Sequence, residues 1–269
     1  MGKGKPFLEV LASAIHEDYR FPILEIFAFL YTLGTFVFAS FGSSIVSQTV
    51  TNESIAYTLT SSLLGVPLFI FIILIFKNIA YGLGSDLEKG IIQSYLSYPL
   101  KRWAILTAKL ISAIGIALIL FVTIQISALY VLAPDVISPY LGTVILTYAT
   151  TLSPSLFVAG IMLLVTLFLR RGGLTLVIGI VLYFAMNIIS SVALVVAYAT
   201  DSSMPLQIMS VIAPNVALAE YYSTINVPFG NGLWSPAFSE VLFFTGISYT
   251  IIGVLFFLGY YYFIRRLGL

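Results

Sequence analysis

The sequence predicts an all-α membrane protein with six transmembrane helices, and three observations support this fold class. Hydrophobic residues make up 60% of the 269 residues and charged residues only 9%, whereas a soluble domain carries about 25% charge. The apolar residues stand in long uninterrupted blocks, which raise the mean hydropathy to +1.07. Lys and Arg recur at every second break between these blocks. We therefore expect residues 1–269 to form a single transmembrane domain.

Six apolar stretches are long enough to span a bilayer. A helix rises 1.5 Å per residue, so about 20 residues cross about 30 Å of hydrocarbon. The stretches cover residues 23–40, 59–81, 104–131, 141–169, 174–199 and 241–264.

The N-terminal residues 1–22 predict a cytoplasmic segment with an amphipathic helix between residues 7 and 18. Its polar face carries Glu9, Ser13, His16 and Glu17. Its apolar face carries Phe7, Leu8, Val10, Leu11, Ala14 and Ile15. Such a helix lies along the membrane surface.

Residues 200–240 predict an extracellular segment between the fifth and sixth spans. A further crossing within 206–222 would bury Gln207 and Glu220, and Pro214 would break its helix. We expect two short helices that meet near Pro214 in the outer leaflet, where protein or water satisfies the exposed backbone.

The distribution of Lys and Arg orients the chain in the cell membrane. With six crossings all 12 fall on one side, while the charged residues of the opposite connections are all acidic. The positive-inside rule then places both termini in the cytoplasm. Lys77 and Lys109 are expected to reach the cytoplasmic surface along their flexible stems. The basic residues are Lys3, Lys5, Arg20, Lys77, Lys89, Lys101, Arg102, Lys109, Arg170, Arg171, Arg265 and Arg266.

Composition argues against several functions. The net charge of +1 gives no electrostatic basis for nucleic-acid binding. Cys is absent and His16 is the single histidine, so we expect no catalytic, metal or cofactor site. No phosphate-binding G-x-x-x-x-G-K-[ST] loop occurs, so any ATP hydrolysis is expected in a separate subunit.

The cytoplasmic loop 82–103 carries the main functional signal. Ser85 followed by Glu88 reads as a capping box, and Asp86 adds favourable charge at a helix start. Pro99 is expected to end that helix about four turns later. Its apolar half would carry Leu87, Ile91, Ile92, Tyr95, Leu96 and Tyr98, with Glu88 inside it.

This loop resembles that of type-two ABC transporter permeases. The matching pattern is acidic Glu88, basic Lys89 and Gly90, an apolar stretch 91–98, Pro99, basic Arg102 and Lys109. Ile91 departs from the family, which often has Thr there.

In that family the loop is a coupling helix that sits in a cleft of an ATP-binding subunit. The resemblance implies two such subunits, which hold ATP and Mg, and a second permease chain that is identical or homologous. It also implies that the transporter is an exporter. The docking residues that it implies are Asp86, Glu88, Lys89, Gly90, Ile92, Tyr95, Leu96, Pro99 and Arg102. Ile92, Tyr95 and Leu96 are expected to contact the ATP-binding subunit through the exposed faces of their side chains.

Two polar residues within the spans, Gln125 and Asn187, either line a cargo pathway or bridge helices. The alternatives to an ABC permease are a stand-alone secondary carrier and a membrane anchor subunit. A carrier usually needs carboxylates inside the membrane, and a haem anchor needs paired histidines. The sequence does not specify the cargo.

Overall fold

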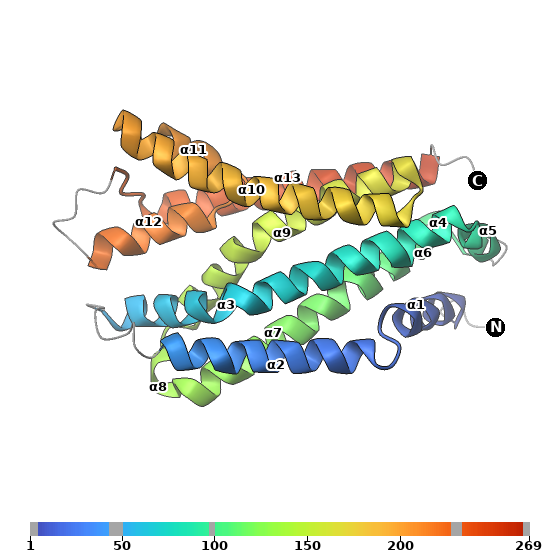
Figure 1. The fold of residues 1–269 in the computed structure, drawn as a ribbon, viewed down its shortest axis with the longest axis horizontal. Coiled ribbons are helices and arrows are strands. Elements are labelled where there is room, and N and C mark those ends of the chain that lie inside the picture. The colour runs from blue at the N-terminus through green and yellow to red at the C-terminus, as the bar shows by residue number, and fades with distance from the viewer. Residues whose placement is uncertain (1–4, 43–50, 97–99, 227–232, 266–269) are drawn as a thin grey trace.

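The computed structural model describes residues 5–42, 51–96, 100–226 and 233–265, and every regular element in these ranges is helical. The long helices run roughly along one axis and form an elongated bundle (Figure 1). Five continuous helical stretches are long and apolar enough to cross a membrane, at residues 52–88, 102–132, 141–169, 172–200 and 238–265. The all-α membrane fold is thereby confirmed.

A sixth crossing depends on the first two helices. Helix α1 (Lys5–Asp18) and α2 (Ile23–Gly42) together meet the same criteria of length and composition, but the chain bends by 63° between them. The bend lies at residues 19–22, where the sequence places Pro22. The count of six spans stays a prediction.

The stretches 52–88 and 102–132, which are the second and third of the predicted spans and keep those names below, are composite helices. The second comprises α3 (Asn52–Lys77), the π-helical segment η2 (Asn78–Gly84) and α4 (Ser85–Glu88). The third comprises α6 (Arg102–Leu110), the π-helical η3 (Ile111–Ile116) and α7 (Ala117–Leu132). Between them stands the short helix α5 (Ile91–Leu96), and α8 (Pro134–Ile137) follows the third span.

The second span begins earlier than hydropathy predicts because its first turns are polar. Thr51 caps α3, and its hydroxyl accepts a hydrogen bond of 3.2 Å from the backbone N–H of Ser54. The hydroxyls of Thr58 and Thr60 then donate to carbonyls four residues earlier in the same helix. These internal bonds satisfy polar groups that lower the hydropathy without ending the helix.

The remaining spans agree closely with their predicted bounds. They are α9 (Leu141–Leu169), α10 (Gly172–Thr200) and α13 (Phe238–Arg265). Helix α9 packs against α3, α10 and α13 and forms the centre of the bundle. By contrast, only 6% of the most apolar stretch of α10 is buried, against 56% of that of α9.

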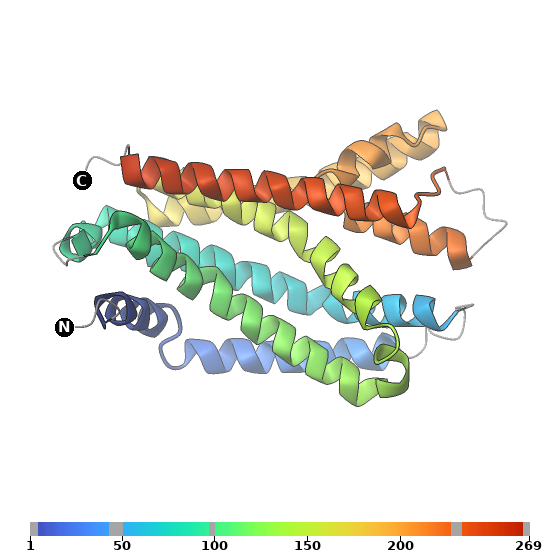
Figure 2. The same ribbon diagram turned by 180° about the vertical axis from the view of Figure 1, so that it is seen from behind.

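The segment between α10 and α13 forms a helical hairpin, as Pro214 predicts. Helices α11 (Met204–Ser210) and α12 (Asn215–Asn226) meet at that proline. The hydroxyl of Ser248 donates to the carbonyl of Ile212 over 3.2 Å. Ser248 lies ten residues into α13, or about 15 Å along its axis, so the apex of the hairpin reaches the middle of the bundle (Figure 2).

One end of the bundle gathers α1, α4, α5 and the last turn of α13 (Figures 1 and 2). Every Lys and Arg side chain that the structure describes lies at this end or within about three helical turns of it. The hairpin and α8 occupy the opposite end, where the charged residues Glu53, Asp135, Asp201, Glu220 and Glu240 are acidic. We call these the basic end and the acidic end.

Candidate functional site

The loop at the basic end differs from the predicted capped helix in two respects. The first is that Ser85 does not begin a helix. Its backbone N–H already bonds to the carbonyl of Ala80, and no side chain caps α4. The predicted capping box is wrong because the preceding span continues through η2 and satisfies the donors that Ser85 and Glu88 would have capped.

The second difference is a break at Gly90. Its φ of +71° lies in the left-handed region, where a glycine has no steric penalty. The chain therefore turns after α4 and restarts as α5. The single helix predicted from Ser85 to Pro99 is wrong, and Pro99 itself lies outside the described residues.

The exposed carboxylate of Glu88 caps another helix. Its Oε2 accepts a hydrogen bond of 3.3 Å from the backbone N–H of Gly172, the first residue of α10. A negative charge is favourable there because the free N–H groups of a helix start carry partial positive charge. Glu88 thus connects the end of the second span to the start of α10, which sequence alone did not indicate.

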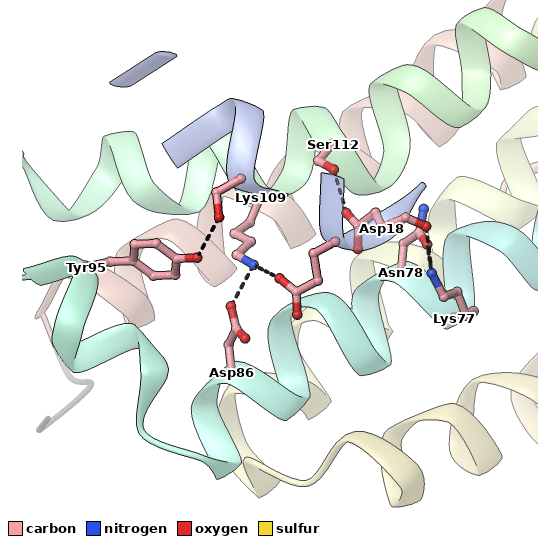
Figure 3. A network of polar contacts seen from close by, with 9 residues as sticks. Asp18, Lys77, Asn78, Asp86, Tyr95, Lys109 and Ser112 are labelled. Carbon is pink, nitrogen blue, oxygen red and sulfur yellow. Dashed lines mark hydrogen bonds and ion pairs between the residues drawn. The ribbon is translucent and has the colours of Figure 1, made fainter. Parts of the chain in front are cut away.

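The main finding at this end is a buried ion-pair network (Figure 3). Lys109 of α6 is only 2% exposed, and its Nζ lies 2.6 Å from Asp86 Oδ2 and 2.8 Å from Glu17 Oε2. The Asp86 side chain is 1% exposed. The expectation that Lys109 reaches the surface is wrong, because two carboxylates from α1 and α4 hold it in the interior.

A second set of polar contacts continues from Asp18, which is also buried (Figure 3). The hydroxyl of Ser112 donates to the Asp18 carboxylate, and Lys77 Nζ donates to the Asp18 carbonyl over 2.8 Å. Lys77 also donates to Asn78 Oδ1, so its ammonium turns inward to these two acceptors. Burial raises the pKa of Asp18 to about 6. Helix α1 is therefore fixed to both the second and third spans.

Helix α5 packs against the same spans and also contacts α1. Ile92 is completely buried in an apolar cluster with Leu83, Leu106 and Leu110 of the adjoining spans. The hydroxyl of Tyr95 lies 3.4 Å from that of Ser13 in α1. The exposed face that was expected for Ile92 does not exist, because that side chain anchors α5 to the bundle.

The predicted docking residues thus divide into three groups. Glu88, Lys89 and the neighbouring Ile91 have exposed side chains, while Gly90, Tyr95 and Arg102 are half-buried. Asp86 and Ile92 are buried within the chain. The side chain of Leu96, like Pro99, lies outside the described part of the chain.

The two polar residues inside the spans have different surroundings. Gln125 is buried in α7, and its Nε2 donates to Thr35 Oγ1 of α2 over 2.6 Å, so it bridges two helices. Asn187 is exposed on α10 and donates only to the carbonyl of Tyr183 in its own helix. Asn187 lines two adjoining hollows instead of bridging helices.

No group of three or more His, Asp or Glu side chains in the described ranges is arranged to hold a metal ion. His16 is exposed on α1. Comparison of the chain with protein-family models and with curated protein sequences found no match. At the basic end, ion pairs and apolar packing hold α1, α5 and three spans together.

Proposed function

We propose that the chain is the membrane-spanning subunit of an ABC transporter with six spans and both termini in the cytoplasm. Helix α5 and the exposed Glu88, Lys89 and Ile91 are the surface on which an ATP-binding subunit docks. Asp86 and Ile92 act from inside, as anchors of that surface. Arg102 and Tyr95 border it.

The attachment of α5 carries this proposal. A docking element transmits motion only if it is fixed to the elements that must move. Ile92 fixes α5 to the second and third spans, the contact between Tyr95 and Ser13 fixes it to α1, and Glu88 holds the start of α10. A push on α5 therefore reaches three spans and the surface helix together.

The gathering of the described Lys and Arg at the end with α5 supports the cytoplasmic location of this end. A second permease chain has an available surface on α10, whose apolar stretch is almost entirely exposed in the single chain.

The test is retention of an ATP-binding subunit by the tagged chain. ABC ATP-binding subunits from the same genome are co-expressed with the wild type and with Lys89→Glu and Glu88→Ala variants, then copurified in detergent. We expect the wild type to retain one of them in stoichiometric amount and both variants to lose most of it. The matched control is Asp135→Lys, a charge reversal at an exposed site of the acidic end. Failure of the wild type to retain any ATP-binding subunit would refute the proposal.

A stand-alone proton-coupled carrier is the second candidate, and the buried Asp18, Asp86 and Lys109 are the observation that favours it. Ionisable groups of this kind mark proton pathways in many transporters. Asp18 and Asp86 also border a groove of about 590 Å³ between α1 and the second span. A carrier requires no ATPase, so the copurification above separates the two candidates.

A further inference from the structure

A small cavity with several polar side chains in its wall lies at mid-depth, where α3, α9, α10 and the turn between α11 and α12 meet. Its volume is about 130 Å³, equal to that of about four water molecules. No charged residue lines it. The polar side chains in its wall are Thr151, Ser155, Tyr183, Asn187, Ser190 and Asn215.

The cavity collects side chains whose hydrogen-bonding capacity is unused. Elsewhere in these helices hydroxyls donate to the carbonyl four residues earlier, as Thr150 and Thr166 do. Thr151, Ser155 and Ser190 form no side-chain hydrogen bond with another described residue. Asn215 adds a buried Oδ1 atom that has no partner among the described residues. Such groups are costly in a bilayer unless a ligand or water pairs with them.

Pro154 leaves one more hydrogen-bond acceptor without its usual partner beside the cavity. It lies inside α9 and in the cavity wall, and it has no N–H to donate to the carbonyl of Thr150. Within a membrane such a gap is tolerated where the helix borders a cavity or another polar partner. The cavity therefore suits a ligand that both donates and accepts hydrogen bonds and carries no charge.

An apolar hollow adjoins the cavity at Asn187, which lines both. This hollow has a volume of about 380 Å³ and runs along the exposed side of α10 beside Phe184, Ile188 and Val192. Hydroxyl-binding groups at one end and an exposed, shallow apolar face of α10 at the other match an amphiphile. We propose that the two hollows bind an uncharged lipid-like molecule, with its hydroxylated head between α9, α10 and Asn215 and its chain along α10.

This inference does not depend on an ATP-binding partner, and binding to the purified full chain tests it directly. The probe is monoolein, which has an uncharged head with two hydroxyls, and its affinity is measured by native mass spectrometry in detergent. Methyl oleate, without hydroxyls, and oleoyl lysophosphatidylcholine, with a charged head, are the comparison ligands. We expect monoolein to bind at least about tenfold more tightly than either.

Variants locate the site. Thr151→Val and Asn215→Ala each remove hydrogen-bonding groups from the cavity wall and are expected to weaken monoolein binding about threefold to tenfold. Thr200→Val is the matched control on α10, because the Thr200 hydroxyl donates to the carbonyl of Val196 and lies outside the cavity. Its affinity for monoolein should equal that of the wild type.

A photoreactive monoolein with a diazirine in its acyl chain tests the same site in the wild type, without any substitution. We expect labelled peptides to cover residues 184–195 of α10. Equal binding of methyl oleate, unchanged affinity in both cavity variants, or labelling confined to other spans would each overturn the inference. A chain that binds monoolein but retains no ATP-binding subunit would refute only the proposed function.

Discussion

Replacement of Lys109 by Met tests whether the buried ion-pair network holds the basic end together. The Nζ atom of Lys109 lies 2.6 Å from the nearest carboxylate oxygen of Asp86. At an effective dielectric constant of about 20, two unit charges at that distance attract by about 6 kcal/mol before the cost of removing both from water is counted. The substitution keeps a side chain of similar length and removes the charge.

The net effect depends on how buried the remaining charges are. Asp86 is 1% exposed, so its carboxylate would be left unpaired in the interior, at a cost of about 3–5 kcal/mol. Glu17 is 43% exposed, so water solvates it and its loss of a partner costs about 0–1 kcal/mol. At about 2 °C or more per kcal/mol for a chain of this size, we expect the melting temperature to fall by at least about 6 °C.

The assay is thermal unfolding of the purified chain in detergent, followed by tryptophan fluorescence. Lys89→Met is the matched control, since Lys89 is an exposed lysine on the same loop. Its melting temperature should stay within about 2 °C of the wild type. In the double variant Asp86→Asn with Lys109→Met no charge is left unpaired at Asp86, and at least half of the lost stability should return.

Two results would refute this reasoning. One is a Lys109→Met variant no less stable than Lys89→Met. The other is a double variant with the full combined loss of its two single variants, because independent sites add whereas an interacting pair does not.

Three further predictions concern other parts of the chain. Gly90→Ala should lower the free energy of unfolding by about 1–2 kcal/mol, because φ at Gly90 is +71° and a side chain is strained in that conformation. The control is Gly173→Ala, which should not lower this free energy because no atom lies near the added methyl group. Urea titration of the two variants compares the effects. Gln125→Leu should change the same free energy by less than about 1 kcal/mol, because the lost bond to Thr35 is offset by removal of a buried, unpartnered Oε1 atom, and a larger loss in thermal unfolding would contradict this. Burial raises the pKa of Asp18 from 3.8 to about 6, so the folded chain holds a proton there that the unfolded chain has released. The free energy of unfolding should therefore fall by about 3 kcal/mol as the pH rises from below 3.8 to above about 6. Unfolding of the Asp18→Asn variant, measured from pH 4 to 7, should not show this fall.

Hydropathy was sufficient to predict the long helices. The bounds of α9 match the predicted span 141–169, and Pro214 marks the turn between α11 and α12. These features depend on apolar length and on backbone chemistry, both of which are local properties of the sequence. The polar first turns of α3 were missed because hydropathy does not register hydroxyls that bond within their own helix.

The basic end was predicted less well, because its structure depends on contacts between distant segments. The sequence does contain the residues of a capping motif at Ser85, but the preceding helix already provides a partner for the backbone N–H of Ser85. Lys109 finds its partners 92 and 23 positions earlier in the chain, at Glu17 and Asp86. No periodic pattern in the segments that contain Glu17, Asp86 and Lys109 predicts such a pairing. The unusual presence of charges near the ends of apolar spans was the available signal.

The chain separates two chemical environments along its length. Its buried charges lie at the basic end, around Asp86 and Lys109, whereas the mid-depth cavity is lined by uncharged groups alone. Helix α10 connects the two, because Glu88 contacts its first residue and Asn187 lines the cavity. The 15 positions between Gly172 and Asn187 span about 22 Å, so a tilt of α10 by about 5° about its Glu88-bound end moves the cavity wall by about 2 Å. A displacement of that size exceeds what a hydrogen bond tolerates. A small motion of the proposed docking surface would thus be sufficient to change the affinity of the ligand that we propose between α9 and α10.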